Sequence, residues 1–281
     1  MAEAKLFLFH LLILLVGRGA SGSSVAILSS PGSIDSRNPH VDLRIEQVRS
    51  SSLPHVHHHM DPSVIVFFFL EDLKQGNTLP IHFPKRGSNT SRMLPREEAD
   101  SIPFSSRDLD YLLRLFSFRQ GSPQAVAMED TLRQCETRAI KGETKLCATS
   151  WESMLDFART NLGRDLELKI LSTIHLTRSN TLLQKYTVNG IDEITAGKMM
   201  ACHTMPYPYG VLYCHYQKSP SKVFKVSLTG ENGDKVEAVA VCHMDTSQWS
   251  HKHVAFEVLG IEPGSSPVCH FFPEDHFVMV A

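Results

Sequence analysis

The chain has 281 residues, of which 42% are hydrophobic and 21% charged, a balance that excludes disordered and collagen-like proteins and allows a buried core. Its 28 basic and 30 acidic residues give a formal net charge of -2, which offers no positive field for phosphates, so we expect no nucleic-acid partner. The 6 cysteines are too few for a small disulfide scaffold, but their even number matters if the chain is exported.

Residues 1–22 are expected to be a secretory signal peptide. Lys5 precedes the apolar run 7–16, and small residues follow Arg18, with cleavage expected between Ala20 and Ser24. The run is shorter than the roughly 20 residues that span a bilayer, so we expect no membrane span after signal removal. The expected location is the secretory pathway, ending outside the cell, in the cell wall or in a protein storage vacuole.

Export changes the interpretation of the cysteines and of one asparagine. In an oxidising compartment, disulfides are expected in preference to metal-bound thiolates. The triplet that begins at Asn89 matches a glycan acceptor, so a glycoprotein is expected.

Residues 23–60 are expected to form a flexible leader, because they are rich in Ser, Pro, Gly and charge and lack a sustained apolar period. A folded domain is predicted over 61–281. The apolar run Ser63–Leu70 predicts a strand buried on both faces near its start.

Three helices are predicted in the first half of this domain. One follows Ser106, where apolar residues recur at helical spacing. A second opens at Ser122–Pro123, because proline in the first turn loses no hydrogen bond. The third opens at Thr149, with Glu152 completing a capping box.

From about Leu166 onward the pattern predicts strands. Apolar and polar residues alternate over 222–229, which predicts a strand. A turn is expected at Asn232–Gly233, and a second strand is predicted over 236–241. The expected fold class is α+β, with a few helices in the first half and a β-rich second half, and no repeat or linker divides residues 63–281.

Four Cys-His dipeptides, separated by 10, 26 and 25 residues, mark the second half: Cys202-His203, Cys214-His215, Cys242-His243 and Cys269-His270. In one interpretation, thiolates and imidazoles bind zinc together, although the Cys-x-x-Cys spacing is missing. In the other, which we favour, each pair lies on an extended segment, so the cysteines face one way for disulfides and the histidines the other. Converging imidazoles would suit Cu(II), Zn or Ni.

Cys135 and Cys147 flank a short loop that one disulfide would close, but six cysteines allow 15 pairings and the connectivity stays open. His251, His253 and His276 also lie in the second half, and His253 is the best candidate for an extra ligand or proton carrier. Aromatic residues near the dipeptides suit packing or a pocket; they are Tyr207, Tyr209, Tyr213, Tyr216 and Trp249.

These motifs together resemble the plant BURP domain. The resemblance rests on the four dipeptides with their spacing, on Phe67–Phe69, on the segment from Cys135 into 147–154 and on 242–249, and it covers about residues 60–281. The short leader without repeats, with the segment His59–Ser63, is most similar to the unknown-seed-protein-like members.

The resemblance implies two functions. Some members are copper-dependent peptide cyclases, which makes copper the expected cofactor and His203, His215, His243 and His270 the expected ligands. No Tyr or Trp precedes Tyr111, so a cyclase would act in trans on a separate Tyr- or Trp-containing precursor. Alternatively, the chain is a non-catalytic seed, storage-compartment or cell-wall protein of development or stress response, which binds wall polymers and uses the Cys-His pairs as a structural staple.

Overall fold

The computed structural model describes residues 66–84, 91–177 and 180–281. The chain divides into two units, Met1–Val56 and His57–Ala281, and all described residues lie in the second. The expected signal peptide 1–22, the leader 23–60 and Asn89 lie outside the described residues.

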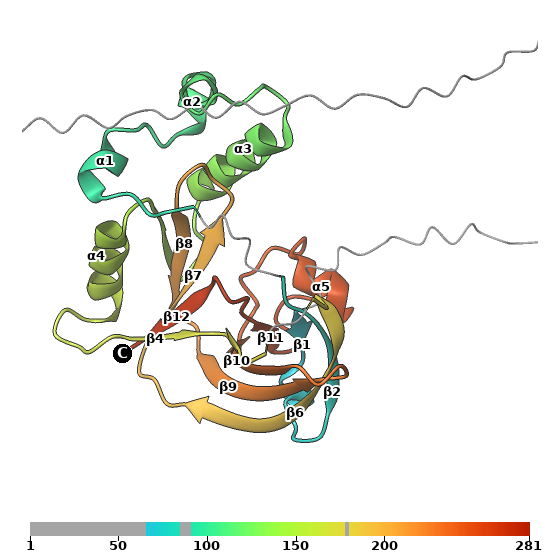
Figure 1. Cartoon of the computed structure of the whole chain (residues 1–281). Coiled ribbons are helices and arrows are strands. Elements are labelled where there is room, and N and C mark those ends of the chain that lie inside the picture. The colour runs from blue at the N-terminus through green and yellow to red at the C-terminus, as the bar shows by residue number, and fades with distance from the viewer. Residues whose placement is uncertain (1–65, 85–90, 178–179) are drawn as a thin grey trace, which may run out of the picture. The chain divides into compact units, whose positions relative to one another are not determined.

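The helices are concentrated in the first half of the described chain (Figure 1). These ranges contain five α-helices: α1 Arg96–Asp100, α2 Leu109–Leu115, α3 Pro123–Glu136, α4 Trp151–Leu162 and α5 Val254–Leu259. Short 3-10 turns occupy Leu70–Asp72 and Ser106–Asp108. None of the helices in these ranges has both the length and the hydropathy needed to cross a bilayer.

The strands form two antiparallel sheets. They are β1 Phe67–Phe68, β2 Thr78–His82, β3 Glu143–Ala148, β4 Lys169–Ser172, β5 Ile174–His175, β6 Leu183–Ile194, β7 Met199–Met205, β8 Val211–Gln217, β9 Ser221–Gly230, β10 Lys235–His243, β11 Val268–Phe271 and β12 Phe277–Val280. The seven-stranded sheet has the order β1-β11-β10-β9-β6-β2, with β5 also paired to β10. The five-stranded sheet has the order β3-β8-β7-β12-β4.

Each sheet buries one apolar face. On the five-stranded sheet, α4 packs Met154 and Ala158 against Met200 and Met279. The helices α2 and α3 cover the β7–β8 turn through Leu112 and neighbouring apolar residues. A further cluster of valines and Phe272 joins residues from both sheets, so the two sheets share buried surface.

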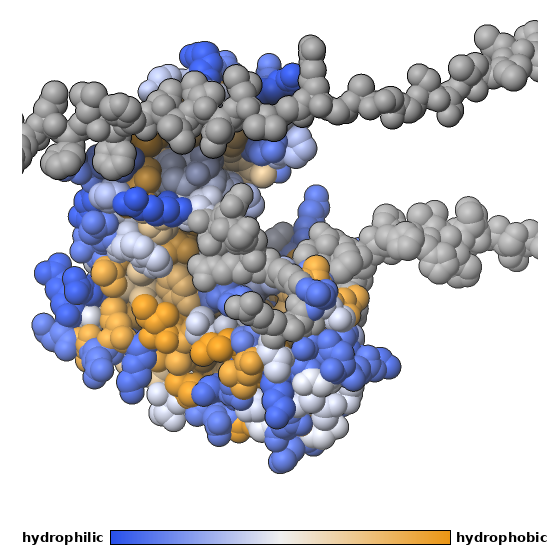
Figure 2. Space-filling view, in the orientation of Figure 1, coloured by the Kyte–Doolittle hydropathy of each residue, from blue (hydrophilic) through white to orange (hydrophobic). Residues whose placement is uncertain are grey.

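One edge of the five-stranded sheet leaves apolar side chains in solvent. Ile170 on β4 is 57% exposed, and Ile174 and Leu176, which follow it in the chain, are exposed to a similar degree. Figure 2 shows apolar side chains gathered on the face where Figure 1 labels β4. Exposed apolar side chains therefore lie on β4, at the edge of the five-stranded sheet, and on and after β5, which pairs with β10 in the other sheet.

Most sequence predictions of secondary structure are confirmed. The predicted helices after Ser106 and Ser122 are α2 and α3, and Ser122 caps α3 by accepting a hydrogen bond from the Ala125 N–H. The alternating run and the returning strand are β9 and β10.

Three details differ. The third helix opens one residue later than predicted, with Ser150 and Ser153 as the capping pair, because Ser150 has the extended backbone that a cap requires. Within the described part of Ser63–Leu70, only Phe67 and Phe68 form a strand, which lies at the sheet edge with Phe67 half-buried. Helices α1 and α5 were not predicted, because each spans less than two turns and shows little periodicity.

Candidate metal centre

The first two Cys-His pairs lie side by side on the hairpin formed by β7 and β8. Cys202 and Cys214 are register partners and form a disulfide with a Cα–Cα distance of 4.1 Å. Because side chains alternate along a strand, His203 and His215 face the opposite way. The sulfurs enter the apolar core beneath α4, and the imidazoles line a cavity.

The other two pairs repeat this arrangement on β10 and β11 of the seven-stranded sheet. Cys242 and Cys269 are register partners, are joined as a disulfide and lie in the core of that sheet. His243 and His270 line the same cavity. The expected two-face arrangement of sulfur and imidazole is thus present in both sheets.

The third disulfide joins Cys135 on α3 to Cys147 on β3, so all six cysteines are paired and none is free to bind metal as a thiolate.

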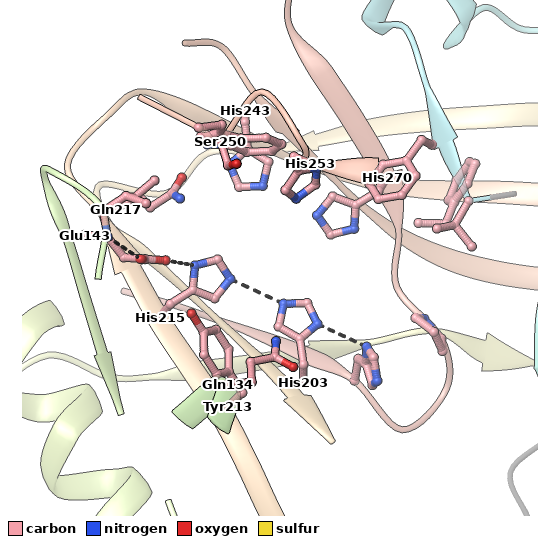
Figure 3. A pocket seen from close by; sticks show the side chains of 17 residues that line it. Gln134, Glu143, His203, Tyr213, His215, Gln217, His243, Ser250, His253 and His270 are labelled. Atoms are coloured by element: carbon pink, nitrogen blue, oxygen red, sulfur yellow. Dashed lines mark hydrogen bonds and ion pairs between the residues drawn. The ribbon is translucent and has the colours of Figure 1, made fainter. Parts of the chain in front are cut away.

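Six imidazoles converge on one open cavity of about 500 Å³. They come from both sheets, from the start of α5 and from the loop before β12: His203, His215, His243, His253, His270 and His276. In Figure 3, His203 and His215 lie on one side of the cavity, and His243, His253 and His270 lie on the other.

The imidazoles on the first side are within hydrogen-bond distance of one another. The Nε2 atoms of His203 and His215 are 3.3 Å apart, and the Nδ1 atoms of His203 and His276 are 3.1 Å apart. Thr204 fixes the loop that carries His276 by donating a hydrogen bond to the Asp275 carbonyl. The sequence places His276 in the same half of the chain as the other histidines but contains no motif that assigns it to the site.

The imidazoles on the second side pack against aromatic rings. His243 and His270 are stacked, with centroids 5.6 Å apart, and Trp249 lies 4.9 Å from His243 and 4.5 Å from His253. This side of the cavity therefore has an aromatic wall beside its ring nitrogens.

Burial favours the neutral form of five of these imidazoles, those of His203, His243, His253, His270 and His276. Desolvation lowers the pKa of His203 and His243 well below the usual value, and the neighbouring imidazoles lower it further. Desolvation lowers the pKa of His270 to about 3, and it also lowers the pKa of His253 and His276. Neutral imidazole is the form that binds a metal ion.

The donor set fits an ion that prefers nitrogen ligands. Two nitrogens that each lie about 2.0–2.1 Å from one tetrahedral ion are about 3.3 Å apart, which matches the His203–His215 separation. Within the described ranges, no three His, Cys, Asp or Glu side chains already form a complete metal site. An ion held by this pair would need His243 or His270 to turn inward.

His253 and His251 differ sharply although only one residue separates them. The Nδ1 of His253 accepts a hydrogen bond from the Ala255 N–H, so a neutral His253 carries its proton on Nε2. With the proton on Nε2 and with Nδ1 already accepting a hydrogen bond, His253 is better suited to donate a hydrogen bond than to bind a metal ion. His251 is exposed beside Glu262 and does not line the cavity.

Several polar and aromatic residues of the cavity come from distant parts of the chain. Glu143 on β3 and Gln217 on β8 line it, as do Gln134 on α3 and Tyr213. The sequence alone does not point to Glu143, Gln217 and Gln134, because nothing local marks one polar residue on a strand or helix as facing a cavity. Tyr207 and Tyr209 instead pack in the core near α2 and α3.

Comparison with known proteins shows the family of this chain. Residues 66–281 match the family model described as the BURP domain, so the expected start at residue 61 stays a prediction. The chain is 47% identical to the BURP domain-containing protein BNM2A of Brassica napus over 228 residues, which cover 79% of this chain and 81% of that protein. It is 45% identical to the BURP domain protein USPL1 of Arabidopsis thaliana over 78% of this chain and 81% of that protein. It is 41% identical to the BURP domain protein RD22 of Arabidopsis thaliana over 78% of this chain and 56% of that protein. The chain therefore belongs to the BURP-domain family of plant proteins.

Proposed function

We propose that this chain is a copper-dependent oxidase that joins a Tyr or Trp side chain to a carbon of a separate peptide precursor. The observation that carries this proposal is the pair of facing Nε2 atoms, 3.3 Å apart, at the wall of an open cavity with an aromatic lining.

The residues that would hold copper are His203 and His215, with His243 and His270 as the further nitrogen donors. Copper, when bound, would supply one-electron redox chemistry with O₂ as the oxidant. The two disulfides behind these histidines fix the strands that carry them, which favours a defined ligand geometry.

The cavity offers groups that would bind a peptide. Gln217 has a buried side-chain oxygen without a hydrogen-bond partner among the described residues, and such an oxygen suits a peptide N–H. His253 would present its Nε2–H to a peptide carbonyl. Trp249 and Phe67 line the same wall and would contact an aromatic side chain.

The reaction must remove two hydrogen atoms. The new bond forms between the substrate aromatic ring, or its heteroatom, and a carbon, and each partner loses one hydrogen. O₂ accepts the two electrons and two protons and leaves as hydrogen peroxide. In this proposal the protein positions both parts of the peptide and excludes bulk water from the buried imidazoles.

The experiment is reconstitution of the pure protein with Cu(II), followed by incubation in air with a panel of Tyr- and Trp-containing peptides. A product lighter than the substrate by two hydrogens, absent without copper or without O₂, is expected by mass spectrometry. Unchanged masses across the panel would contradict the proposal.

A second candidate function is non-catalytic, with the Cys-His pairs as a structural staple and a wall polymer or developmental partner as the ligand. The observation that favours it is ring packing, because His203 and His270 both stack on the buried Phe272 at 5.2 and 4.9 Å. Under this proposal the protein gains no stability from stoichiometric Cu(II), whereas a copper enzyme is stabilised by it.

We also propose that the chain is exported and that Asn89 carries a glycan. Three disulfides and the absence of free cysteine support an oxidising compartment. Mass analysis of the protein recovered from a plant secretory route is expected to find the new N-terminus between Ala20 and Ser24 and a glycan on Asn89. An intact N-terminus would contradict export through a cleaved signal.

A further inference from the structure

Glu143 is a buried carboxylate held by its own turn. Its side chain is only 8% exposed, and its Oε2 accepts a hydrogen bond of 3.1 Å from the Ile140 N–H. The Glu143 N–H in turn donates to the Ile140 carbonyl. Gly142, with φ of +84°, supplies the left-handed backbone that this turn requires. The position of the carboxylate is therefore set by backbone contacts.

The second oxygen of Glu143 is directed toward a histidine of the proposed copper site. Oε1 lies 3.1 Å from Nδ1 of His215, whose side chain is 14% exposed (Figure 3). Nδ1 has no assigned hydrogen-bond partner among the described residues, and the Glu143 carboxylate is the acceptor beside it. A carboxylate beside Nδ1 favours the tautomer that carries the proton there, which leaves Nε2 without a proton and able to accept a hydrogen bond.

From His215 a row of close ring nitrogens continues to two more imidazoles. Nε2 of His215 faces Nε2 of His203, and Nδ1 of His203 faces Nδ1 of His276. Each of these two contacts needs one proton, so the tautomer of His215 fixes the other two. With Nε2 of His215 as acceptor, His203 carries its proton on Nε2 and His276 on Nδ1.

We propose that Glu143 is a positioning residue that sets the tautomers of His215, His203 and His276 and thereby keeps Nε2 of His215, which faces His203 at the cavity wall, unprotonated. Its value for copper rests on the proposed function, but the tautomers are a property of the metal-free protein.

The substitution Glu143→Gln separates this role from simple packing. The amide has one oxygen, which the Ile140 N–H will claim because that donor is fixed by the turn. The amide NH₂ then faces Nδ1 of His215 and donates to it. His215 must move its proton to Nε2, and the tautomers of His203 and His276 invert with it.

The test is nitrogen NMR of the imidazoles in the metal-free, full-length protein, where protonated and unprotonated ring nitrogens have separate chemical shifts. Wild type is expected to show His215 protonated on Nδ1, and Glu143→Gln is expected to show all three tautomers inverted. The matched control is Glu136→Gln, since Glu136 also accepts a backbone N–H, from Ser106, but does not line the cavity. It should leave the three tautomers unchanged.

Protonation of His215 on Nε2 in the wild type would overturn the proposal, and this measurement does not depend on the variant folding. Unchanged tautomers in a folded Glu143→Gln protein would also overturn it.

A Cu(II) titration adds the link to the proposed function. Loss of a contact to the second nitrogen of a metal-bound histidine weakens binding about 10–100-fold. This loss is expected for Glu143→Gln and not for Glu136→Gln. If wild type binds no Cu(II), the proposed function fails while the tautomer result still decides the role of Glu143. If wild type binds Cu(II) and Glu143→Gln binds it equally well, the positioning role fails alone.

Discussion

At the scale of residues, the cavity gives different roles to histidines that look alike in the sequence. His251 and His253 share one short segment, yet the first is exposed and the second caps α5 with Nδ1. The ring nitrogens of His203 lie within hydrogen-bond distance of two other imidazoles, whereas His243 and His270 stack on each other, with Trp249 beside His243. The role of each histidine therefore depends on which of its ring nitrogens already makes a hydrogen bond and on which groups lie beside the ring.

Gln217 provides a residue-scale prediction for substrate binding. Gln217→Leu removes the buried oxygen proposed to accept a peptide N–H, and a lost hydrogen bond of this kind costs about 1–3 kcal/mol. The KM for a cyclised peptide is expected to rise about tenfold with kcat little changed, because the contact is made in ground state and transition state alike. An equal KM in steady-state kinetics would remove Gln217 from the peptide site. Gln248→Leu, on the exposed segment after β10, is the control.

At the scale of elements, a disulfide and a pair of imidazoles occupy opposite faces of the β7–β8 hairpin, so the proposed metal binding would be coupled to the stability of this hairpin. The double variant Cys202→Ala/Cys214→Ala is expected to lose about 2–5 kcal/mol of unfolding free energy. It should also weaken Cu(II) binding, because His203 and His215 are no longer held in register.

Cys135→Ala/Cys147→Ala is a matched control, since both disulfides close loops with a sequence separation of 12. It should lose a similar amount of stability, measured by chemical denaturation, and keep nearly the wild-type Cu(II) affinity. Equal affinity losses in both double variants would show that the β7–β8 disulfide has no special role in holding the imidazoles.

Local patterns predicted the elements better than their assembly. The alternation of apolar and polar residues was sufficient to predict β9 and β10. The alternation of side-chain direction along a strand also predicted that cysteine and histidine of each Cys-His pair face opposite ways. It could not show that strand pairs of two different sheets would meet at one cavity, since that depends on long-range packing around Phe272. Nor could it find Glu143, which reaches His215 only because β3 pairs with β8 across 71 intervening residues.

At the scale of the whole molecule, several neutral imidazoles in one cavity make stability depend on pH. A histidine whose pKa is lowered by folding is protonated below about 6.5 in the unfolded chain but not in the folded protein. The unfolded chain then binds more protons, so the metal-free protein loses stability as pH falls below 6.5. For His270 this loss continues down to about pH 3.

The expected cost at about pH 5 is near 2 kcal/mol, relative to neutral pH, for each imidazole that stays neutral. His270→Phe keeps a ring against Phe272 but removes the titration, so its unfolding free energy should depend less steeply on pH between about 6.5 and 4. His251→Phe, at an exposed position, should follow the wild-type curve. Parallel curves for wild type and His270→Phe in denaturant titrations would contradict the assigned pKa direction.

The most direct test of the copper proposal is a Cu(II) titration of the metal-free protein, followed by paramagnetic resonance of the bound ion. The account predicts one tightly bound copper per chain, with a signal split by imidazole nitrogens, in wild type and in the exposed-site variant His251→Ala. It predicts loss of that ion in His203→Ala/His215→Ala. Equal copper binding by wild type and this double variant, or no nitrogen splitting, would contradict it.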